Sequence, residues 1–141
     1  KSALFSALRE SEKIMSSADT PDTQPEYSTG FHTALTVIRY IEKYFHTHLT
    51  EQSIAKELNF HPYYLARLTK RYFDPTPHRY LMECRINEAI RLMLTTDCTI
   101  SEAAERSGFS NLSHFSTVFR KHTGMSPIDW RNFEISNGEK V

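Results

Sequence analysis

The 141-residue sequence has no long apolar run, only two cysteines and only four glycines. No stretch approaches the ~20 apolar residues that a membrane span needs, and no signal-peptide pattern stands at its start. Cys84 and Cys98 lack the spacing of metal ligands, and we expect a reduced cytosolic pair rather than a disulfide. These absences predict a cytoplasmic protein of one domain, or one domain with an appendage, outside the membrane.

Patterns of catalytic residues are also missing. There is no nucleophile–base set, no phosphate-binding loop and no metal cluster, and Cys84 has no histidine nearby in sequence. His46 and His48 form an H-x-H pair, but no further metal ligand stands at a convincing spacing. Histidines at the end of a helix more often complement the helix dipole. The sequence therefore predicts a protein that is not an enzyme and needs no cofactor.

The charges cancel, with 17 basic and 17 acidic residues, which at first argues against nucleic-acid binding. Their distribution answers this objection. Residues 58–73 and 106–128 contain no acidic residue but several basic ones. Screening limits the reach of each charge to ~8–10 Å, so the local charge matters more than the sum. The two acid-free windows favour contact with an anionic partner, and helix packing alone is the alternative explanation.

Residues 99–131, TISEAAERSGFSNLSHFSTVFRKHTGMSPIDWR, have the pattern of a helix-turn-helix. Thr99 and Glu102 have the spacing of a capping box at the start of a helix. Gly108 supplies the positive φ of a sharp turn, either Ser110 or Asn111 caps the next helix, and Gly124 ends it. In a helix-turn-helix the second helix lies in the major groove of DNA.

A second copy of this pattern lies about fifty residues earlier, in TEQSIAKELNFHPYYLARLTKRYFDPTPHRYL. The copies align with one gap at the turn. Asn59 matches Gly108, and asparagine is a common non-glycine residue in the left-handed conformation. Thr76-Pro77 and Ser126-Pro127 each combine an N-cap with a proline at the first helical position. The sequence thus predicts helix-turn-helix units at about 50–73 and 99–123, joined by a long helix over about 77–95.

This arrangement resembles the C-terminal DNA-binding domain of the AraC/XylS family of bacterial transcription regulators, over roughly residues 34–132. The second copy carries the most specific part of the family pattern: Ala104, Gly108, Phe109, Phe115, Phe119, Arg120, Lys121, Gly124, Ser126, Pro127, Trp130 and Arg131. The first copy departs from the pattern at Thr69, where phenylalanine is usual, and at Asp74, where glycine is usual. Ala103 also replaces a usual isoleucine.

The resemblance implies an all-α fold of about seven helices, with the two units and their linker helix inside a domain at 31–133. A helix with a core-facing stripe is expected over 31–49, and a tail over 134–141. Residues 1–30 read as a short amphipathic helix followed by a flexible linker rich in Ser, Thr and Pro. This helix is either a remnant of an upstream sensing or dimerisation domain or a helix docked on the DNA-binding domain.

By resemblance the protein is a sequence-specific regulator, an activator that binds promoter DNA and contacts RNA polymerase, with dimerisation through an upstream domain outside this chain. The linker helix, at ~1.5 Å per residue, spans roughly 27 Å, near the ~34 Å between successive major grooves on one face. The two reading helices, those expected to enter the grooves, would then read one asymmetric site. The alternative is a helical protein-interaction module that has lost DNA binding.

The candidate DNA contacts form matching outward stripes on the two reading helices. Arg67 is the strongest candidate for a bidentate contact to guanine, and Tyr63 and Ala66 suit thymine methyl groups. The remaining candidates are small polar residues for bases or bridging waters and basic residues for phosphates: Lys70, Arg71, Asn111, Ser113, Ser116, Thr117, Arg120 and Lys121. Arg85 and Arg131 resemble family positions with structural roles and stand outside this set.

Overall fold

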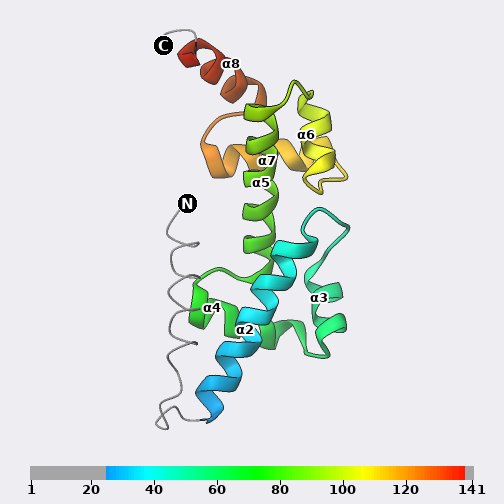
Figure 1. Ribbon diagram of the computed structural model, residues 1–141. Coiled ribbons are helices and arrows are strands. Elements are labelled where there is room, and N and C mark those ends of the chain that lie inside the picture. The colour runs from blue at the N-terminus through cyan, green and yellow to red at the C-terminus, as the bar shows by residue number, and fades with distance from the viewer. Residues whose placement is uncertain (1–24, 139–141) are drawn as a thin grey trace. The chain divides into compact units, whose positions relative to one another are not determined.

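The computed structural model describes residues 25–138, which form seven helices and no strand (Figure 1). Their bounds are α2 (Pro25–Tyr44), α3 (Glu51–Leu58), α4 (Pro62–Phe73), α5 (Pro77–Thr95), α6 (Ile100–Arg106), α7 (Leu112–Thr123) and α8 (Pro127–Gly138). The all-α class is confirmed, with α3–α4 and α6–α7 as the two helix-turn-helix pairs. The helix predicted before residue 17 lies outside the described residues.

The chain divides into two compact units. Among the described residues, the first unit holds 25–40 and 51–78, and the second holds 41–50 and 79–138. In the first unit, α2, α3 and α4 bury Val37, Ile38, Ile54 and Leu65 almost completely. This core fixes the inner face of α4 and leaves its other face to solvent.

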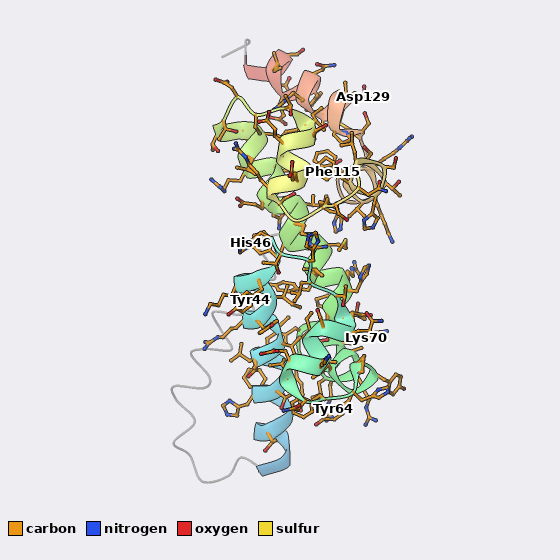
Figure 2. All side chains as sticks on the ribbon, turned by 90° about the vertical axis from the view of Figure 1, so that its right-hand side faces the viewer. Tyr44, His46, Tyr64, Lys70, Phe115 and Asp129 are labelled. Carbon is orange, nitrogen blue, oxygen red and sulfur yellow. The ribbon has the colours of Figure 1, made fainter. Side chains whose placement is uncertain are left out.

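The second unit is built around a chain of aromatic rings. Phe115 and Phe119 on α7 are fully buried, and Phe115 is labelled among the helices of this unit in Figure 2. Ring centroids lie 5.1 Å apart from Phe109 to Phe115, 5.5 Å from Phe115 to Phe119, and 5.8 Å from Phe119 to Trp130 on α8. Contacts between aromatic rings at these separations stabilise a core beyond the burial of their area. They hold α7 between the turn before it and α8.

Arg85 on α5 organises the loop that follows α2. Its Nε donates to the Phe45 carbonyl at 2.8 Å, and its Nη2 donates to the Thr47 and Leu49 carbonyls at 2.8 and 3.3 Å. Burial lowers the pKa of this guanidinium, and the three carbonyls compensate for its lost hydration. Arg131 on α8 similarly donates to the Cys98 carbonyl at 2.6 Å. Both arginines therefore have the structural roles expected of them.

Three predicted boundaries are wrong. The linker predicted up to Gly30 ends earlier, because α2 already begins at Pro25 and Gly30 packs against α4 at Leu68 and Tyr72. The same helix ends at Tyr44 rather than Leu49, because residues 45–49 form the loop that Arg85 holds. The tail predicted from 134 is helical as far as Gly138 in α8.

Both cysteines are free thiols, Cys98 buried and Cys84 partly buried. Burial raises the pKa of the Cys84 thiol to about 12, so it stays protonated at neutral pH. Its neighbour Tyr80 donates a hydrogen bond of 2.5 Å to Glu42, and burial raises the pKa of the Tyr80 hydroxyl well above its usual value. These groups are consistent with a packed, structural role for this part of α5.

Candidate nucleic-acid interface

The turns of the two helix-turn-helix pairs share a residue with positive φ and a backbone hydrogen bond. Asn59 and Gly108 both have positive φ, at 59° and 108°. In each copy the next residue donates its N–H to the alanine five positions before it, Phe60 to Ala55 and Phe109 to Ala104, both at 2.9 Å. The predicted match between asparagine and glycine at this turn is confirmed.

Each reading helix begins with a side-chain cap at an equivalent position. Asn111 Oδ1 accepts from the His114 N–H at 3.0 Å, which decides between the two predicted caps, Ser110 and Asn111. His61 caps α4, and its Nδ1 accepts from the Tyr63 N–H at 3.2 Å. The sequence prediction missed this cap because histidine is not among the usual N-cap residues. Pro62 at the first helical position was the available signal.

Each reading helix also ends at a residue with positive φ. Asp74 and Gly124 both have a φ of 82°, and their N–H groups donate to the Lys70 and Arg120 carbonyls at 3.2 and 2.7 Å. Asp74 thus adopts the positive φ that the family pattern assigns to glycine. The departure at this position keeps the positive φ and the hydrogen bond, while ψ differs, at −52° for Asp74 and −3° for Gly124.

The inward faces of the two reading helices exchange the positions of a threonine and a phenylalanine. Position 69 holds threonine where the second copy holds Phe119, and position 73 holds phenylalanine where the second copy holds Thr123. Thr69 is fully buried and its hydroxyl donates to the Leu65 carbonyl at 3.0 Å. Phe73 lies one turn later and packs on Phe31 of α2 at 5.7 Å. The first unit therefore places its aromatic ring one turn further along the helix.

The outer faces of α4 and α7 match position by position. At four of the five equivalent pairs both residues are exposed, and at the second pair both are half-buried. The pairs are Tyr63 and Ser113, Ala66 and Ser116, Arg67 and Thr117, Lys70 and Arg120, and Arg71 and Lys121. With Asn111 at the cap of α7, these are all the predicted contact residues. In each unit the fold brings them onto the solvent side of one reading helix.

Two of these side chains have part of their hydrogen-bonding capacity in use. The Thr117 hydroxyl donates to the Ser113 carbonyl at 3.0 Å, so its methyl group and its oxygen remain for a partner. The Asn111 side-chain oxygen holds the cap, which leaves its NH₂ group to donate. Both side chains can therefore still contact a partner, Thr117 through its methyl group and oxygen and Asn111 as a hydrogen-bond donor.

The exposed cations of the two reading helices have few partners within the protein. Within residues 25–138, Arg67, Lys70, Arg120 and Lys121 form no ion pair. The Arg71 guanidinium lies over the Tyr72 ring, 5.4 Å from its centroid. Neither reading helix has an acidic residue in its first turn. Cations without internal partners can neutralise phosphates and release counterions.

The part of the chain that the structure describes holds neither a metal-binding cluster nor a membrane-spanning helix. It brings together no three side chains of the kinds that bind metals. None of its helices has both the length and the apolar character for a membrane crossing.

A family model for a helix-turn-helix domain matches residues 54–132, more than half of the chain. The chain is 32% identical over 95 residues to the transcriptional activator RhaS of Salmonella schwarzengrund, covering 67% of this chain but only 34% of that protein. This chain therefore spans about a third of the length of that relative.

Solved structures agree with this match. The C-terminal domain of AraT, a response regulator from Geobacillus stearothermophilus, is 35% identical with a TM-score of 0.68, covering 72% of this chain and 84% of that one. The DNA-binding domain of the transcriptional factor AdpA, solved with a target DNA, shares the fold with a TM-score of 0.70 at 21% identity, covering 77% of this chain and 98% of that one. The chain thus belongs to the AraC/XylS family of helix-turn-helix regulators, which bind DNA to control transcription.

Proposed function

We propose that α4 and α7 each enter a major groove and that together they read one asymmetric site in promoter DNA. The observation that carries this proposal is the matched pair of exposed, acid-free stripes on the two helices. Three of the five paired positions differ in chemistry between the copies, so the two helices recognise different base sequences. Successive major grooves are the natural sites for two such helices in one chain.

Within this proposal the residues divide by chemistry. Arg67 reads a guanine through a bidentate contact, and Tyr63 and Ala66 contact thymine methyl groups. On α7, Ser113, Ser116 and Thr117 contact bases directly or through water. The phosphate contacts come from the residues that carry a positive charge or a free amide: Lys70, Arg71, Asn111, Arg120 and Lys121.

We further propose that the protein activates transcription through contact with RNA polymerase. RhaS, a relative at 32% identity, is named a transcriptional activator, which supports this direction of control. A sensing or dimerisation domain outside this chain remains part of the proposal, since the chain spans only 34% of that relative. The helices from α2 to α8 are then the DNA-binding part.

Two substitutions test the proposal on duplexes selected from a random library. We expect Arg67→Ala to relax the preference at one or two base pairs of one half-site, because a bidentate contact is worth ~1–3 kcal/mol of discrimination. We expect Lys121→Ala to weaken binding to all sequences and to lower the slope of log affinity against log salt by about one unit.

Binding curves at several salt concentrations, with sequencing of the selected duplexes, measure both effects. If neither substitution changes affinity or preference, the assignment of the reading faces is wrong. A wild-type chain that retains no duplex at any salt concentration would instead indicate a protein-interaction module. The departures at Thr69 and Asp74 do not favour that alternative, because the fold accommodates both.

A further inference from the structure

An exposed ring stands at the third position of each reading helix and packs on the phenylalanine of the preceding turn. Tyr64 lies 5.5 Å from Phe60, with an angle of 32° between the rings. His114, its equivalent in the second unit, lies 5.6 Å from Phe109 at 69°. The ring pair is therefore repeated in both units, although the turns differ by one residue.

Both rings carry a hydrogen-bond donor at an exposed position. Tyr64 is 41% exposed and labelled in Figure 2, and His114 is exposed as well. Within residues 25–138, neither the Tyr64 hydroxyl nor a His114 ring nitrogen has a hydrogen-bond partner. Contact with the turn phenylalanine restricts each ring, so the donor is held in place before any partner binds.

The two rings lie on the same edge of their helices as a cation. Tyr64 and Arg71, and likewise His114 and Lys121, are seven residues apart, which is about two helical turns and ~10.5 Å along the axis. Each reading helix therefore has an edge with a ring that carries a donor near its start and a positive charge near its end. No acidic residue interrupts this edge in either copy.

The outward positions of the two reading helices are of two kinds: at some the chemistry differs between the copies, and at others it is kept. Positions 63, 66 and 67 differ in chemistry from 113, 116 and 117, whereas Lys70 and Arg120, and Arg71 and Lys121, keep a cation. Positions 64 and 114 keep a ring with a donor. Bases differ between two half-sites but the phosphate backbone does not, so a position that contacts phosphate can keep its chemistry in both copies.

We propose that Tyr64 and His114 donate hydrogen bonds to backbone phosphates beside the major groove, and that Phe60 and Phe109 position them. This inference rests on the proposed DNA binding. It adds two residues outside the basic set to the contact surface. Because the phosphate backbone is the same at every base pair, these contacts add affinity for any sequence.

The test uses Tyr64→Phe and His114→Phe, which keep the ring contacts and remove only the donors. In the full chain at pH 8, we expect each to raise Kd about 2- to 10-fold on selected and random duplexes alike, the effect of one lost hydrogen bond. The thermal midpoint should not change. Tyr64→His and His114→Tyr keep a ring with a donor and should retain the wild-type affinity. His32→Phe is the control, because His32 is an exposed histidine on α2 with a similar edge-on contact to Phe31, at 6.2 Å.

Neutral methylphosphonate groups, placed singly along a selected duplex, locate the contacts. We expect one substituted position to weaken wild-type binding and to have little effect on Tyr64→Phe, and a second position to behave in the same way for His114→Phe. Wild-type affinity in both phenylalanine variants, or a changed base preference, would overturn the inference. The proposed function would survive that result as long as Arg67→Ala and Lys121→Ala behave as expected, whereas a chain that binds no duplex would end both.

Discussion

Four residues between 25 and 138 have positive φ, and each one follows a helix: Asn59, Asp74, Gly108 and Gly124. Backbone conformation alone disfavours a β-carbon at such positions. Space adds a second requirement at Gly108, where a β-carbon would lie 2.5 Å from the Phe45 carbonyl oxygen and 2.8 Å from Arg85 Nε. At Gly124 no atom lies within 4 Å of that point.

This difference predicts unequal costs for the same substitution. Gly124→Ala should lower the free energy of unfolding by about 1 kcal/mol, the cost of the left-handed conformation. Gly108→Ala should lower it by at least about 3 kcal/mol, because it also displaces the Arg85 side chain and the loop that this residue holds. Urea unfolding followed by circular dichroism measures both values. Equal losses would mean that the contact between Gly108 and the 45–49 loop contributes nothing.

Some of the turn and cap residues could be predicted from the sequence, and one could not. Glycine at 108 and 124 and asparagine at 59 were predicted because their conformational preferences are local. The same holds for Thr99, whose side chain accepts from the Glu102 N–H at 3.1 Å. The His61 cap was not predicted, because a histidine accepts in this way only in a suitable tautomer and ring orientation.

At the scale of the helix, the two units place a buried phenylalanine at different positions along the reading helix. The first unit has Thr69 and Phe73, and the second has Phe119 and Thr123. Phe73 is 6% exposed and packs on Phe31, while Phe119 is fully buried and packs on Trp130. A family pattern that requires phenylalanine at 69 therefore misses the compensation one turn later.

We predict that Thr69→Phe destabilises the first unit. Thr69 is fully buried among packed neighbours, so a phenylalanine there should lower the free energy of unfolding by about 1–3 kcal/mol. Thr69→Ser, which keeps the hydroxyl bond to Leu65, is the control and should cost less. Chemical denaturation compares the two. A rise in stability for Thr69→Phe would show that the space behind α4 is not filled.

Helix boundaries could be predicted where a cap or turn residue marks them, as for α5 between Pro77 and Thr95. The start of α2 could not, because a segment rich in Ser, Thr and Pro resembles a linker, although Pro25 fits a first helical position. The end of α8 was missed because Glu134, Ser136 and Asn137 give it no apolar period. Its position depends on contacts of Trp130 and Arg131 that are remote in sequence.

At the scale of the whole molecule, the net charge is zero, but the basic and acidic residues are unevenly distributed along the chain. The acid-free windows coincide with the reading helices and the turns next to them, so the sequence alone located the candidate surface. The apolar pattern indicated the buried side of each helix, but the sequence could not give the exposure of the individual outward side chains. The structure adds that the five paired outward positions are exposed, or half-buried, alike in both copies. Each helix can therefore present the same set of positions to DNA.

Because the positions are equivalent, exchanging their residues should exchange what they read. Tyr63→Ser, Ala66→Ser and Arg67→Thr together give α4 the base-reading residues of α7 while keeping its cations. Selection from random duplexes should then return sites with two copies of one half-site, where the wild type returns two different ones. The reciprocal variant, Ser113→Tyr, Ser116→Ala and Thr117→Arg, should return two copies of the other half-site. If both variants select the wild-type pair of half-sites, the bases are read by residues outside these stripes.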